Sequence, residues 1–296
     1  MKADYFLLDV FTDKKFGGNQ LAVFAEASDI PENKLQLIAK ELNLPESVFL
    51  YPPETENGDF KMRIFTPGKE LTTAGHPTIG TVHLLLNELK TSCKEDKNLK
   101  LEQLVGEIPV TFDREGDKCI NITMKQPNPE FGRLIQKREL VAEILSIPIS
   151  DLMPGMPIQC ISCGNPFLFV PVKSLNVLAE VKPRIDLLQQ YENTLGTSAF
   201  YVFTNDTQSE ADTRGRMFAP LWGITEDPAT GSASGPLGCY LVRHGLCDGE
   251  KILCEQGFEM GRPSSIRVSI SHTNHIIDQV FVGGEAVLVG RGTLFI

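Results

Sequence analysis

Two glycine-containing turns carry most of the residues in this chain that could do chemistry. The first reads Gly75-His76-Pro77-Thr78, and the second reads Thr230-Gly231-Ser232. An apolar stretch follows each turn, which indicates that each turn leads into a helix. Free backbone N–H groups and the positive end of the helix dipole make such a start a candidate carboxylate or phosphate site. Glycine and threonine also begin helices for purely structural reasons, so this alternative stays open.

Three titratable side chains near these turns suit proton transfer. Glu46, between an expected helix and an expected strand, is either a general acid and base or a solvated turn residue. His76 shuttles a proton or caps its own helix. Asp227 orients His76, binds a substrate amine or caps the helix that follows Pro228. Its neighbour Glu226 is expected to be solvated.

Other kinds of site find little support in the sequence. No GxGxxG, GxxxxGK[ST] or GxSxG motif is present. Cys160-Ile-Ser-Cys163 has redox or zinc spacing, but it lies in an apolar stretch without a second pair, which favours buried thiols. The histidines are scattered, at positions 76, 83, 244, 272 and 275, with the last two in an expected loop. We therefore expect no metal and no organic cofactor, and proton transfer is the chemistry that this inventory permits.

The two glycine turns belong to an internal repeat of the sequence. Arg63-Ile-Phe-Thr-Pro67 and Arg216-Met-Phe-Ala-Pro220 each precede one of the glycine turns. Leu101-Glu-Gln103 is echoed by Cys254-Glu-Gln256 later in the chain. Several motifs recurring in the same order predict a duplicated fold.

Short apolar or alternating runs predict strands, the stretch over 31–42 has helical spacing, and the second half repeats this pattern of elements. Strands are expected over 4–10, 21–24, 48–51, 60–65, around 157–172 and over 199–203, and helices over 31–42, 139–145 and 184–191. The fold class is therefore α+β, built twice, with domains over 1–128 and 129–296 that meet near Pro127-Asn128-Pro129. Small-molecule sites are common between domains, so we expect the site in a cleft between the halves. In the second half, the stretch matching Glu46, 195–200, has no carboxylate.

The composition excludes several classes of partner. The formal net charge of −10 argues against binding to nucleic acid or to an anionic membrane surface. No apolar run approaches the roughly 20 residues that span a bilayer, and the start of the chain lacks the features of a signal peptide. Seven scattered cysteines fit reduced thiols in the cytoplasm better than a disulfide framework.

The motifs together resemble those of the phenazine-biosynthesis (PhzF-like) family. The resemblance covers 6–292 and rests on the motif over 63–67, on Glu70-Leu71, on 74–80, on 226–233 and on 255–263. It implies a diaminopimelate-epimerase-like fold: two pseudo-symmetric halves, each a curved, mostly antiparallel sheet or barrel around a central helix. It also implies a homodimer that needs no cofactor. The best-understood member isomerises trans-2,3-dihydro-3-hydroxyanthranilate, so the resemblance implies an isomerase acting on a small carboxylate-bearing metabolite.

The resemblance also assigns roles to individual residues. It implies that Glu46 is the acid and base, supported by His76 and Asp227. The substrate carboxylate would be held by the backbone around Gly75, His76, Gly231 and Ser232, with Asn19 lining the cleft.

Two departures from the family pattern matter. Pro45 replaces a small hydroxyl residue that many relatives have before the glutamate. Gly75 and Thr230 stand where related epimerases have their two thiols, which argues against two-thiol epimerisation. A lyase or hydratase, or a non-catalytic protein that binds a carboxylate or a partner, remains an alternative.

Overall fold

The computed structural model describes residues 1–273 and 276–296, and the chain divides into two units. The first unit contains Met1–Lys125 and Gly283–Ile296, and the second contains Gln126–Val282. The segment 283–296 therefore belongs to the first unit, whereas a single division at 128/129 would place it in the second. The reason is that β18 (Ala286–Phe295) pairs with β1 (Lys2–Val10) along its whole length.

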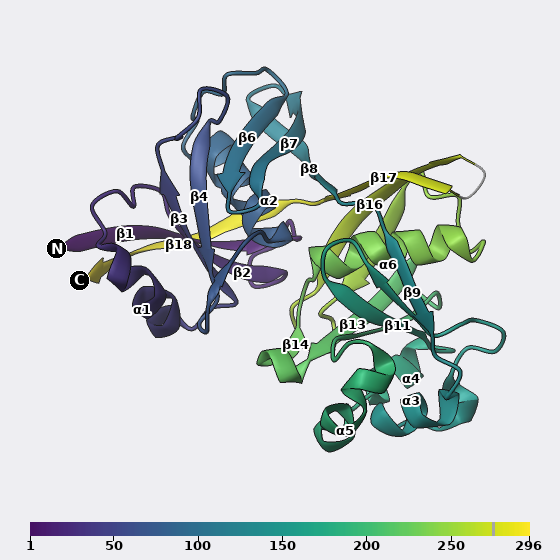
Figure 1. The fold of residues 1–296 in the computed structure, drawn as a ribbon. Helices are drawn as coiled ribbons and strands as arrows, with labels where there is room; N and C mark the ends of the chain where they lie inside the picture. Colours follow the sequence, from purple (N-terminus) through teal and green to yellow (C-terminus); the bar gives the residue numbers. More distant parts are fainter. Residues whose placement is uncertain (274–275) are drawn as a thin grey trace. The chain divides into compact units, whose positions relative to one another are not determined.

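The sheet of the first unit is mostly antiparallel (Figure 1). Its strands follow one another in the order β18, β1, β2 (Asn19–Phe24), β3 (Glu46–Tyr51), β4 (Phe60–Phe65), β6 (Asn98–Gln103), β7 (Gly106–Glu115) and β8 (Lys118–Gln126). Only the β2–β3 and β4–β6 pairs within this series are parallel. The short β5 (Glu70–Leu71) adds to β4.

A buried helix, α2 (Gly75–His83), packs on one face of this sheet. Every residue of α2 after Gly75 is buried. A side chain at Gly80 would collide with Val10 and Leu21, so the helix lies very close to β1 and β2. The π-helical turn Leu84–Glu88 continues it. The expected central helix is therefore present in the first unit.

The opposite side of the strands is covered by α1 (Glu32–Leu42). Side chains alternate between the two faces of a strand, so Phe24 and Phe49 point away from α2. They stack with ring centroids 4.8 Å apart and join the core that α1 completes through residues such as Leu35. The helix starts after Pro31 and ends at Leu42, which agrees with the helix expected over 31–42, and Asn43 caps it in the left-handed conformation.

The second unit repeats this topology. Its strands run in the order β9 (Glu130–Leu134), β10 (Gln159–Ser162), β11 (Pro166–Pro171), β12 (Phe200–Thr204), β13 (Thr213–Ala219), β15 (Ile252–Gln256), β16 (Ser264–Thr273) and β17 (Ile276–Gly283). The parallel pairs recur in the same places, as β11–β12 and β13–β15. The short β14 (Ile224–Asp227) adds to β13 as β5 adds to β4.

The helices of the second unit also match. The buried α6 (Gly231–Arg243) takes the place of α2. Elsewhere in the unit lie α3 (Arg138–Ile144), α4 (Leu175–Glu180), α5 (Ile185–Leu195) and the 3-10 turns Ile149–Asp151 and Pro220–Trp222. The first three pack through Val141, Leu178 and Leu188 into one core with Val170 and Val202 of the sheet. The expected α+β fold, built twice around a central helix, is confirmed.

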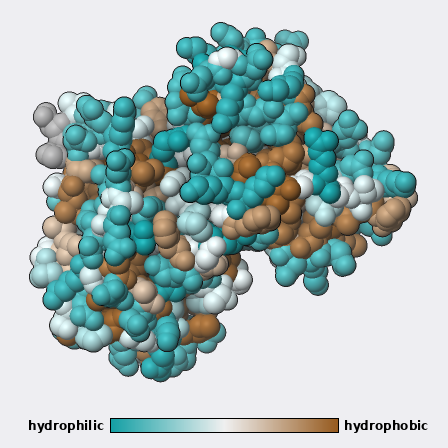
Figure 2. Space-filling model, turned by 180° about the vertical axis from the view of Figure 1, so that it is seen from behind, coloured by the Kyte–Doolittle hydropathy of each residue, from teal (hydrophilic) through white to brown (hydrophobic). Residues whose placement is uncertain are grey.

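The surface carries both hydrophilic and hydrophobic residues. Figure 2 shows a face covered largely by hydrophilic residues, with groups of hydrophobic residues among them. Large apolar side chains that are exposed include Phe16, Ile276 and Phe295. Among the described residues, no helix has the length and apolarity needed to cross a membrane.

Candidate functional site

Glu46 and His76 are brought into contact in the first unit. Glu46 is the first residue of β3, and His76 is the second residue of α2. His76 Nε2 lies 2.9 Å from Glu46 Oε2, and the two side chains are only 8% and 14% exposed. Glu46 is therefore not a solvated turn residue. A carboxylate and an imidazole held together out of bulk water can exchange or share a proton with a bound molecule.

The parallel pairing of β2 and β3 places this glutamate. Glu46 pairs with Leu21, which faces α2 through its contact with Gly80. Asn19 lies two residues before Leu21 on β2, so its side chain emerges on the same face. It is fully buried. The face of the sheet toward α2 therefore carries Asn19 and Glu46, next to the helix start that presents His76.

Asp227 anchors a second polar cluster, in the second unit. Its Oδ2 accepts a hydrogen bond of 2.5 Å from Thr230 Oγ1. Gln256 Nε2 donates to the backbone oxygen of Asp227 (2.7 Å) and to Thr230 Oγ1 (2.9 Å). The helix begins at Gly231 with Thr230 as its N-cap, so Asp227 is not the helix cap. Gly231 and Ser232 form the first turn of that helix.

The prediction that Glu226 is a solvated residue is wrong. It was expected to be solvated, but it forms a two-bonded ion pair with Arg216 (Nε–Oε1 2.8 Å, Nη2–Oε2 2.9 Å). Arg216 Nη1 also donates to the backbone oxygens of Leu178 and Val181. These contacts tie β13 and β14 to the end of α4, so Glu226 is a structural residue.

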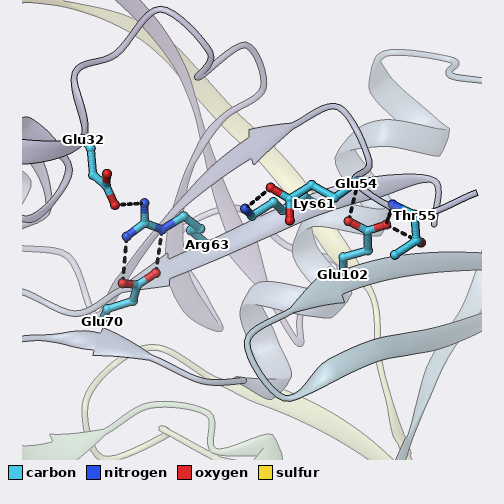
Figure 3. A network of polar contacts seen from close by, with 7 residues as sticks. All are labelled: Glu32, Glu54, Thr55, Lys61, Arg63, Glu70 and Glu102. Atoms are coloured by element: carbon cyan, nitrogen blue, oxygen red, sulfur yellow. Dashed lines mark hydrogen bonds and ion pairs between the residues drawn. The ribbon is translucent and has the colours of Figure 1, made fainter.

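The first unit contains the matching ion pair (Figure 3). Arg63 binds Glu70 through Nε (2.7 Å) and Nη2 (2.9 Å), and its Nη1 reaches Glu32 at 2.9 Å. The hydrogen bond to Glu70 raises the pKa of Arg63 above its usual value, against the effect of burial. In the same picture Glu102 accepts hydrogen bonds from the backbone of Glu54 and Thr55. This network fixes strand ends and a loop.

Strand pairing shows which residues of the two units correspond. Phe49 pairs with Arg63, and Val202 pairs with Arg216. The two arginines therefore match, and counting back three residues along each strand matches Glu46 with Ala199. The second unit has no carboxylate at this position, as the sequence predicts.

The same alignment continues into the two central helices. Ile64 pairs with Leu71, and Met217 pairs with Asp227, so Leu71 takes the place of Asp227. At the helix starts, the Thr78 hydroxyl donates to the backbone oxygen of Ala74.

In the second unit, the Ser234 hydroxyl donates in the same way to the backbone oxygen of Thr230. Ala74 therefore matches Thr230, and His76 matches Ser232. The expected match of Gly75 with Thr230 is off by one residue. Neither Ala74 nor Thr230 carries a thiol.

The cysteines fit the buried thiols that the sequence favours. Cys160 and Cys163 are buried and unpaired in disulfides, and burial raises the pKa of the Cys160 thiol. His272 lies on β16 and not in a loop, whereas His275 is outside the described residues. Within 1–273 and 276–296, no group of three or more His, Cys, Asp or Glu side chains could hold a metal ion.

Comparison with known proteins gives consistent matches over the whole chain. Residues 8–292 match the PhzC-PhzF family model, described as phenazine biosynthesis-like protein. A trans-2,3-dihydro-3-hydroxyanthranilate isomerase of Pseudomonas fluorescens is 35% identical over 292 residues, covering 98% of this chain and 99% of that protein. An uncharacterized isomerase of Clostridium acetobutylicum is 34% identical, covering 99% and 98%. The crystal structure of a PhzF-family phenazine biosynthesis protein of Bacillus anthracis has a TM-score of 0.91 at 28% identity, with both chains fully covered.

Proposed function

Because this chain belongs to the PhzC-PhzF family of phenazine biosynthesis-like proteins and is an isomerase, we propose that it moves a proton on a small carboxylate-bearing metabolite, with Glu46 as acid and base. The reaction would be similar to that of trans-2,3-dihydro-3-hydroxyanthranilate isomerase. The contact between Glu46 and His76 carries the proposal, because it is a buried acid–base pair on the face of the sheet that holds α2.

The chemistry needs only one carboxylate. Glu46 takes a proton from one carbon of the substrate, and the electron pair of that C–H bond enters the conjugated system. The protonated carboxyl group of Glu46 exchanges its proton with water and then protonates a different carbon, so the substrate is isomerised without any net gain or loss of atoms and takes up deuterium in D2O. His76 Nε2, 2.9 Å from Glu46 Oε2, is close enough to exchange a proton with the carboxyl group between the two steps.

The helix starts are the proposed anion-binding elements. In the described structure neither α2 nor α6 has a side-chain hydrogen bond at its N-cap. Backbone amides at Gly75, His76, Gly231 and Ser232 are therefore candidates for the substrate carboxylate. Asn19 is a candidate for a further polar contact with substrate.

The proposal gives Asp227 a supporting role in the same reaction, as a partner for a polar group of the substrate. It also includes a homodimer working in the cytoplasm. Light scattering of the purified protein measures the oligomeric state, and a mass of one chain would contradict the dimer.

Deuterium uptake from D2O tests the function. The protein is incubated with trans-2,3-dihydro-3-hydroxyanthranilate, and in parallel with a metabolite extract, and labelled products are detected by mass spectrometry. Wild type is expected to introduce deuterium, whereas Glu46→Gln loses about 1,000-fold or more of this activity. The matched control is Glu54→Gln, since Glu54 is an exposed glutamate paired with Lys61. A Glu46→Gln protein with a native circular dichroism spectrum and full activity would contradict the mechanism.

A further inference from the structure

Gln256, part of the 255–263 motif, has no part in the proposed chemistry but contacts Asp227 and Thr230. We propose that Gln256 and Thr230 are positioning residues that aim the Asp227 carboxylate for the reaction. This inference rests on the proposed function, because it gives Asp227 a supporting role there.

The amide of Gln256 has only one orientation that fits its surroundings. Its Oε1 accepts hydrogen bonds from the Thr230 backbone N–H (3.1 Å) and the Tyr201 hydroxyl (3.3 Å). Its Nε2 donates to the Asp227 backbone oxygen and to Thr230 Oγ1. A flipped amide would place NH2 against the Thr230 N–H and oxygen against the Asp227 oxygen. Gln256 is fully buried, so its side chain is fixed with its two donors and its acceptor oxygen all in use.

This fixed amide sets the direction of the Thr230 hydroxyl. Because Thr230 Oγ1 accepts a hydrogen from Gln256 Nε2, its own hydrogen is free to point elsewhere. The acceptor at 2.5 Å is Asp227 Oδ2. Hydroxyl hydrogen bonds to a carboxylate are short and strong. The chain of contacts therefore runs from Gln256 through the Thr230 hydroxyl to one oxygen of Asp227, and favours the ionised carboxylate in one rotamer.

The backbone around Gln256 is held as firmly as its side chain. The Ser264 hydroxyl lies within hydrogen-bond distance of the backbone oxygens of Pro228 (2.8 Å) and Gln256 (2.9 Å). Gly257 has a φ of +78°, and a Cβ there would lie 2.5 Å from the Pro228 oxygen. Only glycine lets the end of β15 approach the Asp227–Thr230 segment so closely.

The first unit shows what the same position does without a carboxylate to support. The register of β6 on β4 matches Gln103 with Gln256. Gln103 Nε2 donates to Thr78 Oγ1 at 2.8 Å, and the positions of Asp227 and Thr230 are taken by Leu71 and Ala74. The complete hydrogen-bonded chain occurs in the unit that has the aspartate.

The test uses full-length protein in two measurements. In the first, the carbon-13 NMR signal of the Asp227 carboxyl is followed during a pH titration. Thr230→Val removes the hydroxyl at nearly constant volume, and it should move the titration midpoint up by roughly one pH unit. Thr230→Ser keeps the hydroxyl and should restore the wild-type midpoint. Gln256→Glu, of similar shape, should also raise it. Gln103→Met is the matched control from the first unit, and should leave the Asp227 midpoint in place.

The second measurement is the deuterium exchange described above, across pH. Thr230→Val should lower kcat about tenfold and move the acidic limb of the profile upward, with Thr230→Ser close to wild type. An unchanged Asp227 midpoint in Thr230→Val would overturn the inference, and so would a shifted midpoint with unchanged exchange. Failure of the proposed function itself is recognised separately, because Glu46→Gln would then exchange as fast as wild type.

Discussion

The two units share a topology but have kept different chemistry. The first unit has Glu46 and His76 where the second has Ala199 and Ser232. The second unit has Asp227 and Thr230 where the first has Leu71 and Ala74. The ion pairs Arg63–Glu70 and Arg216–Glu226, by contrast, occur in both.

This difference separates residues that hold the fold from residues that we propose to serve the reaction. A contact that the fold itself needs is present in each copy, since each copy must build the same junction. A polar side chain present in one copy alone is not required by the topology that the two copies share. The comparison therefore singles out Glu46, His76, Asp227 and Thr230 without reference to any substrate.

The largest expected effect concerns the shared ion pairs. Arg216→Met leaves Glu226 buried without its cation and removes hydrogen bonds to α4, which should cost about 4 kcal/mol of unfolding free energy. Arg63→Met should cost roughly 1 kcal/mol, because one of its partners, Glu32, is 80% exposed. Urea denaturation measures both. Equal losses of unfolding free energy in the two variants would contradict this difference between the two ion pairs. The double variant Arg216→Met/Glu226→Leu should recover part of the larger loss, because no buried carboxylate is left without its cation.

The central helices should respond differently to acid. Burial lowers the pKa of His83 in α2 to about 4. Its counterpart in α6 is Cys239, whose pKa is raised by a hydrogen bond with Cys163 and by burial, so that thiol stays neutral. The unfolded chain binds a proton at His83 near pH 6.5, whereas the folded chain does not. Stability is therefore present above pH 6.5 and falls by about 3 kcal/mol as the pH drops to 4.

Hydrogen exchange at pH 7 and pH 4.5 measures this difference unit by unit. The first unit of wild type should lose protection at low pH, and His83→Cys should reduce that loss. If His83→Cys lost as much protection as wild type, burial of His83 would not be its cause.

Substitutions at the matched helix starts should affect different kinetic constants. His76→Asn should lower kcat about 100-fold, because the Glu46 carboxyl loses its neighbour at 2.9 Å. Ser232→Ala keeps the backbone amide proposed to bind substrate, so it should raise KM only about threefold. Steady-state kinetics on a substrate identified by the deuterium-uptake experiment separates the two effects. Equal losses of kcat would show that the helix starts play the same role.

The smallest expected effect concerns the residue after each matched glutamine. Gly257→Ala forces a side chain to within 2.4 Å of the Arg262 backbone oxygen, and should cost about 2 kcal/mol. Leu104 stands at the same place in the first unit and is 59% exposed, so Leu104→Ala should cost less than about 0.5 kcal/mol. Thermal unfolding of the two variants measures the difference. A harmless Gly257→Ala would show that the approach of β15 to Pro228 is not required.

Local features of the fold could be predicted from the sequence because their signals are local. The strand over 60–65 and the helix over 31–42 appear as expected, since each has its own periodicity and boundary residues. The assignment of Gly283–Ile296 to the first unit could not be predicted in this way. Its apolar and β-branched residues are typical of a strand, but nothing in it shows that its partner is β1.

The candidate site shows the same limit. Glu46 and His76 were chosen from the sequence, yet their contact depends on the parallel register of β2 and β3 and on the start of α2. Glu226 was assigned to solvent because its partner, Arg216, lies ten residues away on another strand. The repeat contained a usable signal, since each Arg-containing motif is followed by a glutamate, Glu70 or Glu226. Gln256 was noted as part of a motif, but its role became visible only through its hydrogen bonds.

The pairing of β18 with β1 means that the first unit can complete its fold only after the second unit has been synthesised. Domains generally fold as units while the chain is made, the N-terminal one first. Here β1 is synthesised before the second unit and its partner β18 is synthesised after it, so the strands of the second unit are complete before β1 and β18 can pair. The two ends finally meet through hydrogen bonds between Met1 and Ile296, at 2.8 Å in each direction. A nascent chain therefore carries an open edge at β1 until β18 has been made, and a circular permutant that places β18 directly before β1 would supply both strands together.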